Sequence, residues 1–210
     1  MTTAKLYYFD ARGVAEPVRL ILTYGGVEFE DIRAPLVSLP PVVPPGLKQK
    51  CTWGTFPLIE FEGKKLAQSL AMTRYFAKRF NLVPQDDFEA ALCDEYVDAT
   101  RDLYTAWVPA LREEDANKRE KILEETYEST KKRFMDVFES ILELSPTGKH
   151  LVGDSLTWTD IYVAVVFNNL ELVTKTDLLR AHPLLKSFSE QVFNEPKLKK
   201  WIQNRPDSMF

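Results

Sequence analysis

The residues best placed to form a binding site are concentrated in the segment Cys51–Tyr75. The bond between Phe56 and Pro57 can turn the backbone of Phe56 outward, where its N–H and C=O groups can pair with an extended ligand as a neighbouring strand would. Further along, Gln68 and Ser69 stand at the start of a predicted helix, whose first N–H groups lack intrahelical partners and can receive a carboxylate. The segment therefore predicts a small peptide site, although an ordinary hairpin followed by a capped helix fits the same pattern.

The elements that position these residues are a hairpin and a helix. Strand-forming apolar residues in Leu58–Phe61 precede a tight Glu62-Gly63 turn, which leads into a second strand, Lys64–Ala67. The helix that follows is predicted to carry one apolar face, made of Leu70, Ala71, Tyr75 and Phe76.

The chain before this segment alternates strand and helix signals. Leu6–Phe9 predicts a strand, and Val27–Ile32 predicts a second one. Glu16 and Pro17 open a helix between them, because proline suits the first turn of a helix. We expect the two strands to be parallel and joined by a right-handed crossover. With the hairpin and its helix they make a compact α/β module.

The stretch Pro35–Pro45 contains five prolines. Such a run predicts an extended surface loop rather than a continuous helix or a central strand. We favour a rigid loop that borders the site, and a proline-rich ligand for a partner protein is the alternative.

Only helix signals remain after Pro84. Apolar residues recur at steps close to four from Phe88 to Leu111, and Pro109 is expected to bend or end this helix. Further helices are predicted over Lys118–Leu144, Ile161–Val173, Pro183–Phe193 and Pro196–Gln203.

A capping box is the sharpest local signal in this half of the chain. Thr157 and Asp160 have the spacing at which each side chain binds the backbone N–H of the other. The helix that they start is apolar nearly all round, so we expect it at the buried centre of its domain. The two halves predict an α/β domain over residues 1–82 and an all-α domain over residues 83–210.

The composition is typical of a soluble globular protein. The 210 residues are 45% hydrophobic and 28% charged with a net charge of −4, so we expect no binding to nucleic-acid phosphates. The chain has no apolar run of about 18 residues and no signal-peptide pattern, so we expect no membrane span and predict a cytoplasmic protein. Cys51 and Cys93 are then expected to be reduced, and the two histidines form no cluster with cysteine that would suit zinc.

Three separated stretches resemble the sigma class of the cytosolic glutathione S-transferases, the class that includes haematopoietic-type prostaglandin D synthase. They occur in the family's order within residues 4–205 and read LYYFDARGVAEPVR, WGTFPLIEFEGKKLAQSLAMTRY and LVGDSLTWTDIYV. The resemblance implies a thioredoxin-like N-terminal domain followed by an all-helical C-terminal domain, assembled as a homodimer. It also implies that glutathione is a co-substrate and that no cofactor is bound.

The resemblance makes Tyr8 the catalytic residue. A thiol with a pKa of about 8.5 is mostly protonated at neutral pH, and a hydroxyl that donates a hydrogen bond to the sulfur stabilises the thiolate. Tyr7, its neighbour on the strand, is expected to point the other way into the core. The glutathione contacts that the resemblance implies are Tyr8, Lys48, Phe56, Pro57, Gln68 and Ser69 from one subunit and Asp102 from the other.

The chain departs from the class at the glycine end of glutathione. No aromatic residue lies between Phe29 and Trp53, where the class carries a tryptophan that contacts this end. The glycine carboxylate is thus left to Lys48, with Lys50 as its nearest competitor.

A second departure concerns the other substrate. Val14 stands where the prostaglandin synthases of the class carry an arginine, and Arg101 replaces one of the acidic residues that collect a divalent ion, so no metal site is expected. An apolar, partly aromatic pocket favours hydrophobic electrophiles. The residues that the resemblance places in this pocket are Phe9, Ala11, Val14, Tyr104, Val108 and Pro109.

The sequence thus predicts a glutathione transferase that ionises glutathione and conjugates it to hydrophobic electrophiles, a reaction of detoxification. Two alternatives stay open. One is a non-catalytic structural or binding protein on the same fold, like the lens crystallins derived from this family, and the other is a glutathione-dependent prostaglandin isomerase. A cysteine-based enzyme would need a cysteine before the first helix, and positions 8–13 contain none.

Overall fold

The computed structural model describes residues 3–38 and 40–208 and divides into two units, which are described separately. The first unit holds the described residues up to Asn81 together with those from Pro196 onward, and the second is Leu82–Glu195. The sequence pattern assigns the C-terminal residues to the helical domain over 83–210, whereas the structure groups them with the first unit. The reason is that α9 (Pro196–Asn204) packs along α1 (Glu16–Tyr24).

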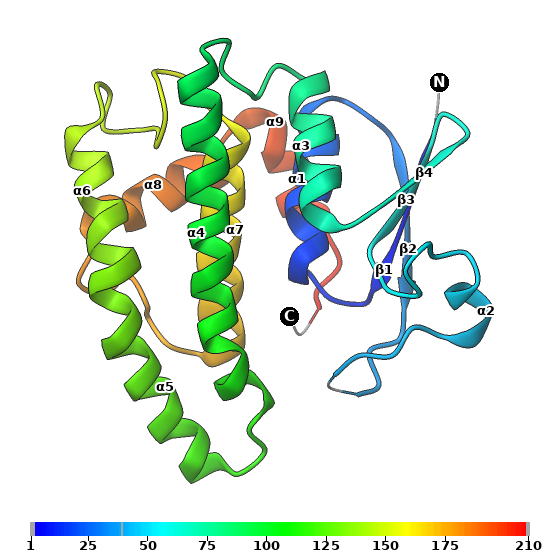
Figure 1. Ribbon diagram of the computed structural model, residues 1–210, viewed down its shortest axis with the longest axis horizontal. Helices are drawn as coiled ribbons and strands as arrows, with labels where there is room; N and C mark the ends of the chain where they lie inside the picture. Colours follow the sequence, from blue (N-terminus) through cyan, green and yellow to red (C-terminus); the bar gives the residue numbers. More distant parts are fainter. Residues whose placement is uncertain (1–2, 39, 209–210) are drawn as a thin grey trace. The chain divides into compact units, whose positions relative to one another are not determined.

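A four-stranded sheet in the order β2-β1-β3-β4 forms the centre of the first unit (Figure 1). The strands β1 (Ala4–Phe9) and β2 (Phe29–Ala34) are parallel, and the hairpin of β3 (Leu58–Phe61) and β4 (Lys64–Ala67) joins the sheet antiparallel to β1. Figure 1 shows α1 and α3 over one face of this sheet and the short α2 on the other. This is the predicted thioredoxin-like α/β module, and its parallel strands and hairpin are confirmed.

The helix α3 (Ser69–Arg79) buries a different face from the one predicted. Leu70 and Phe76 are buried as expected, but Ala71 is exposed and Tyr75 is 44% exposed. Thr73 is fully buried instead, because its hydroxyl donates to the carbonyl of Ser69 at 2.7 Å and needs no water. A count of apolar residue types misses such a satisfied polar side chain.

The described part of the proline-rich stretch is neither a continuous helix nor a strand, as predicted. The helix α2 (Pro45–Lys48) starts at the last of these prolines, where the missing N–H would have no partner in a helix. Val43 is buried and fixes the stretch to the first unit's core, whereas Val37 and Val42 are exposed.

The second unit is all helical over its described residues, as predicted. Its elements are α4 (Asp87–Arg112), α5 (Ala116–Thr130), a π-helical turn (Lys131–Met135), α6 (Asp136–Leu144), α7 (Trp158–Thr174) and α8 (Pro183–Phe193). The helix predicted over Lys118–Leu144 is thus interrupted by the π turn. Pro109 does not end α4, because the carbonyl four residues earlier belongs to Thr105, an exposed residue that water can reach.

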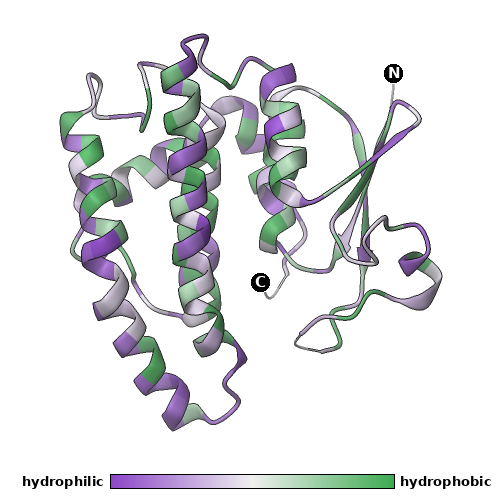
Figure 2. Ribbon diagram, viewed as in Figure 1, coloured by the Kyte–Doolittle hydropathy of each residue, from purple (hydrophilic) through white to green (hydrophobic). Residues whose placement is uncertain are grey.

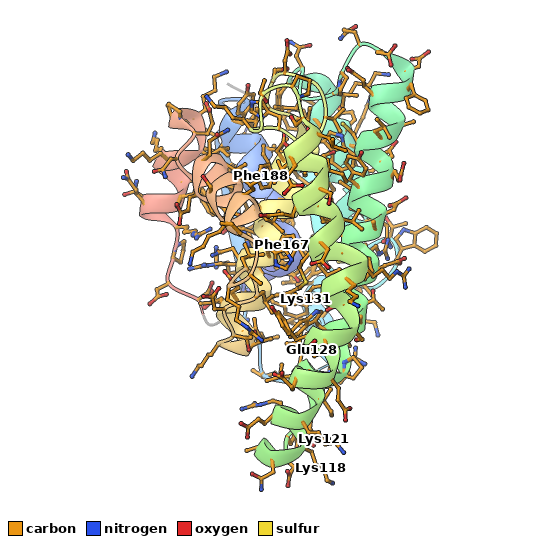
Figure 3. All side chains as sticks on the ribbon, turned by 90° about the vertical axis from the view of Figure 1, so that its left-hand side faces the viewer. Lys118, Lys121, Glu128, Lys131, Phe167 and Phe188 are labelled. Atoms are coloured by element: carbon orange, nitrogen blue, oxygen red, sulfur yellow. The ribbon has the colours of Figure 1, made fainter. Side chains whose placement is uncertain are left out.

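The helix α7 is the buried centre of this unit, as predicted, and all but a few of its residues are buried. The predicted capping box is confirmed, with Asp160 Oδ2 accepting the Thr157 N–H at 2.7 Å. Phe167 of α7, labelled with Phe188 of α8 in Figure 3, packs edge-on against the ring of Phe138 with centroids 6.2 Å apart.

The helix α5 has the most hydrophilic surface of the unit's long helices in Figure 2. Its Lys118 and Lys121 are exposed and lie near its free end in Figure 3. Within residues 3–38 and 40–208, no helix is long and apolar enough to span a membrane.

Candidate active site

The hydroxyl of Tyr8 accepts a hydrogen bond from the turn that follows β1. Tyr8 is half-buried on the strand, and the N–H of Val14 donates to its Oη at 3.4 Å. Val14 belongs to a short 3₁₀ turn, Gly13–Ala15, which leads directly into α1. A tyrosine hydroxyl that accepts such a hydrogen bond at its oxygen is also a donor through its O–H group.

Gly13 brings this turn into contact with the tyrosine. Its φ is +44°, and a Cβ added there would lie 2.5 Å from Tyr8 Oη. Both the backbone conformation and the space therefore require glycine at this position.

Arg19 of α1 binds the backbone of this turn. Its side chain is fully buried, and its Nη1 donates to the carbonyls of Ala11 at 2.9 Å and Arg12 at 3.2 Å. Its Cζ lies 5.7 Å from the centre of the Tyr8 ring, within range of a cation–π contact. One side chain thus contacts both the turn and the tyrosine that the turn positions.

Carboxylates balance the buried charge of Arg19. Its Nη1 pairs with Glu16 Oε2 and its Nε pairs with Asp31 Oδ1, both at 3.1 Å. Burial alone would raise the pKa of Glu16, but the charge of Arg19 and the donors Trp201 and Arg205 hold that pKa below its ordinary value. Glu16 is therefore an ionised carboxylate in the interior of the first unit.

Tyr7 differs from Tyr8 in its surroundings. It is 3% exposed, as predicted for a residue that points into the core, and its hydroxyl donates to Glu60 Oε2 at 3.0 Å. Burial and this hydrogen bond to a carboxylate raise the pKa of Tyr7 to about 12. Its hydroxyl already donates a hydrogen bond to Glu60, so Tyr7 is not suited to donate to a thiolate.

The peptide bond between Phe56 and Pro57 is cis. Phe56 is half-buried, and its ring packs edge-on against Phe9 with centroids 5.2 Å apart, while Pro57 is buried. The paired part of β3 begins only at Leu58, and among the described residues no group hydrogen-bonds with the backbone of Phe56. Its N–H and C=O therefore lack a hydrogen-bond partner within the described part of the chain.

Gln68 and Ser69 form the junction between β4 and α3. Gln68 precedes the helix with φ 72° and ψ 114°, a rare conformation for a residue other than glycine, and its exposed side chain does not cap the helix. Such strain is typical of binding sites. The first N–H groups of α3, with the Ser69 hydroxyl, are suited to hold an anion.

Lys48 is the exposed last residue of α2. Its stem lies against Gly54, where an added Cβ would be 3.3 Å from the lysine Cε. Lys50, its competitor, places its Nζ 5.3 Å from the centre of the Tyr7 ring. Trp53 is 68% exposed. Of the two lysines, Lys48 is the one without a ring contact.

The remaining candidates of the first unit are near the turn. Phe9 and Ala11 are each 5% exposed and belong to its core, while Val14 is half-buried. The core burial of Phe9 and Ala11 leaves little of either side chain to a ligand.

The candidates of the second unit all lie on α4. Asp102 is exposed, and its Oδ2 is 3.6 Å from the Nη2 of Arg133. Tyr104 and Val108 are half-buried, Pro109 is exposed, and burial raises the pKa of Tyr104. Residues 3–38 and 40–208 contain no group of three or more metal-ligating side chains placed to hold an ion.

Sequence reasoning missed the residues that support Tyr8. Gly13, Glu16 and Arg19 were visible in the sequence, and the signal was a charged pair three residues apart within an otherwise apolar helix. Trp201 and Arg205 gave no local signal, since they reach Glu16 from the other end of the chain.

Comparisons with known proteins cover both units. Two family models match, the glutathione S-transferase N-terminal domain over residues 4–78 and the glutathione S-transferase C-terminal domain over residues 101–205. Glutathione S-transferase 1 of Ascaris suum is 34% identical to this chain, and the alignment covers 100% of each protein. Hematopoietic prostaglandin D synthase of Homo sapiens is 31% identical, and the alignment covers 99% of each protein. A solved sigma class structure from Fasciola hepatica, 26% identical, has a TM-score of 0.87 and covers 100% of this chain and 99% of that one.

Proposed function

This chain belongs to the glutathione S-transferase family, and we propose that it ionises glutathione at Tyr8 and conjugates the thiolate to hydrophobic electrophiles. The observation that carries this proposal is the Val14 N–H, which donates to Tyr8 Oη at 3.4 Å, so that the turn after β1 orients the hydroxyl through its oxygen. Sigma-class character is supported by the likeness to the Fasciola hepatica enzyme.

The reaction requires the thiolate, because the thiol is a poor nucleophile. Tyr8 donates its proton to the sulfur in a hydrogen bond that is strongest when the sulfur carries a charge. The Val14 N–H on the tyrosine oxygen polarises the O–H bond further, since linked hydrogen bonds strengthen one another. Tyr8 thus lowers the pKa of the bound thiol without forming a covalent intermediate.

The first unit supplies the groups that hold glutathione in our proposal. The open backbone of Phe56, beside cis Pro57, pairs with the cysteinyl part of the tripeptide, as one strand pairs with another. Gln68 and Ser69 bind the γ-glutamyl carboxylate at the start of α3. Lys48 binds the glycine carboxylate.

The remaining parts of the proposal concern assembly and the second substrate. In a homodimer, Asp102 of a second copy would bind the γ-glutamyl ammonium group. On the first unit, the electrophile would contact Val14. The protein would act without a cofactor or metal, in the cytoplasm, in detoxification.

Conjugation of glutathione to an aryl halide tests the function, with Tyr8→Phe as the decisive variant. A hydroxyl that lowers the thiol pKa by about two units contributes roughly 2.7 kcal/mol, so we expect kcat/KM at neutral pH to fall about 100-fold. The matched control is Tyr7→Phe, which removes the neighbouring hydroxyl from its bond to Glu60 and should retain activity. Equal activity of Tyr8→Phe and the wild type would refute the role of Tyr8.

A second candidate function is the isomerisation of prostaglandin H2, favoured by the 31% identity with hematopoietic prostaglandin D synthase. Both reactions should be assayed side by side, with and without magnesium. We expect conjugation to dominate and magnesium to have no effect, because Val14 and Arg101 replace the groups that the isomerases use. Retention on glutathione resin without turnover of either substrate would instead indicate a binding protein on this fold.

A further inference from the structure

The C-terminal helix α9 and Arg205, the residue that directly follows it, form two hydrogen bonds in the interior of the first unit. Trp201 Nε1 and Arg205 Nη1 each donate to Glu16 Oε1 at 2.9 Å. Glu16 is 1% exposed, so these donors are not interchangeable with water. The Trp201 ring also packs on Phe29 of β2, with centroids 5.2 Å apart.

The other carboxylate oxygen of Glu16 connects these donors to Arg19. Its Oε2 pairs with Nη1 of Arg19 at 3.1 Å, and the same nitrogen donates to the carbonyls of Ala11 and Arg12. These carbonyls directly precede Gly13, whose close approach brings the Val14 N–H to Tyr8 Oη. A continuous set of contacts thus runs from α9 to the tyrosine hydroxyl.

The far side of Arg19 is fixed independently of α9. Its Nε pairs with Asp31 Oδ1 at 3.1 Å, and Arg33 binds the other oxygen of Asp31 at 2.7 Å and Asp10 at 3.1 Å. Asp31 cannot replace Glu16, because it lies on β2 and engages a different nitrogen of the guanidinium. Without the hydrogen bonds of Trp201 and Arg205, Glu16 would keep only its pair with Arg19 Nη1, and the position of that nitrogen would be less restrained.

We infer that Trp201 and Arg205 are positioning residues, through which α9, by way of Glu16 and Arg19, holds the turn that aims the Tyr8 hydroxyl. The inference rests on the proposed function of Tyr8 for its catalytic consequence, but the coupling between α9 and the turn does not. Neither residue belongs to the proposed glutathione contacts. Their effect is on the geometry of the donor.

The test uses Trp201→Phe, which keeps the ring and removes its N–H, and Arg205→Gln, singly and together, in the full-length chain. The control is Lys199→Gln, which removes a positive charge from an exposed position on α9. Arg205→Lys restores the charge and is the variant for rescue. Thermal midpoints report whether each variant is folded.

The first readout is hydrogen exchange of the backbone amides of residues 10–15 without any ligand. We expect exchange to be about tenfold faster in the double variant and unchanged in Lys199→Gln. Unchanged exchange in every variant overturns the coupling, whatever the protein's activity. If the double variant does not fold, Trp201→Phe alone decides, with a smaller increase expected.

The second readout is the ultraviolet absorbance of the bound glutathione thiolate, titrated with pH. We expect the apparent pKa of the thiol to rise by about one unit in the double variant, so that kcat at neutral pH falls about threefold, while KM for glutathione rises by no more than about the same factor. Rescue by Arg205→Lys supports the inference. A lower thermal midpoint with an unchanged thiol pKa overturns it, because α9 is then merely structural. If the wild-type protein binds glutathione without forming the thiolate, the proposed function is refuted. The coupling between α9 and the turn is then tested by hydrogen exchange alone.

Discussion

Two regions of the first unit that border the candidate site are held in opposite ways. The turn of residues 10–15 is bound by Arg19 of α1, whose buried ion pairs connect it with Asp31 of β2 and, through Glu16, with Trp201 of α9. In the described part of residues 35–54, the hydrogen bonds within the stretch join residues no more than four positions apart. Its link to the core is apolar, chiefly through Val43 and Cys51.

The difference corresponds to two kinds of task. A proton donor must be held within a fraction of an ångström of the sulfur, and rigid, satisfied polar networks provide that placement. A side chain that neutralises a terminal carboxylate works over a range of positions, so a local, exposed scaffold is enough. In the proposed function, the turn fixes the position of the Tyr8 hydroxyl, whereas the proline-rich stretch only needs to bring a positive charge near the glycine carboxylate.

Gly13→Ala is the strongest way to break the turn. A Cβ there would lie 2.5 Å from Tyr8 Oη at a φ of +44°, so either the tyrosine or the turn must move. A misplacement of this size costs about 100-fold in kcat/KM. The matched control is Gly46→Ala in the other region, where nothing lies within 4 Å of the added Cβ, and it should retain activity. Comparable losses in both variants would contradict the comparison.

Glu16→Gln tests whether the turn owes its rigidity to a buried charge. Removing one partner of a buried pair costs about 3 kcal/mol, so we expect the free energy of unfolding at neutral pH to fall by that order. The pKa of Glu16 is held below its ordinary value, where charges and donors outweigh the effect of burial. Its contribution is therefore fully present above the ordinary pKa of about 4.3 and is lost as pH falls through the lower, folded-state value.

Denaturant unfolding of both proteins between acidic and neutral pH checks this prediction. The stability gap between the wild type and Glu16→Gln should be widest at neutral pH and should narrow only in strong acid. A gap that is the same at every pH would mean that the ionised form of Glu16 contributes nothing.

The site residues that sequence could supply are those whose role is local. Phe56, Gln68 and Ser69 are marked by a proline and by a helix start, so their positions follow from neighbouring residues. The hairpin and the buried α7 follow equally well from strand propensity and from an apolar run behind a capping box. In each case the physical cause lies within a few residues of the effect.

The support of Tyr8 could not be read in this way. Trp201 and Arg205 are 185 and 189 positions from Glu16, and nothing in the intervening sequence brings them together. The C-terminal residues were assigned to the helical domain for the same reason, because their pattern is helical and their partner, α1, is distant in sequence. Burial of Thr73 depended on one hydrogen bond, which residue type alone does not reveal.

The smallest expected effect belongs to the adaptable region. Lys48 is exposed, and an exposed ion pair contributes about 1 kcal/mol or less. Lys48→Ala should therefore raise KM for glutathione about fivefold at most, with kcat unchanged. Lys50→Ala is the control, since Lys50 lies over the Tyr7 ring, and its KM should stay near the wild-type value. Glutathione esterified at the glycine carboxylate separates charge from packing, because the wild type and Lys48→Ala should then have the same KM. If the ester still distinguishes them, Lys48 acts by shape, and the proline-rich stretch is as rigid at this point as the turn.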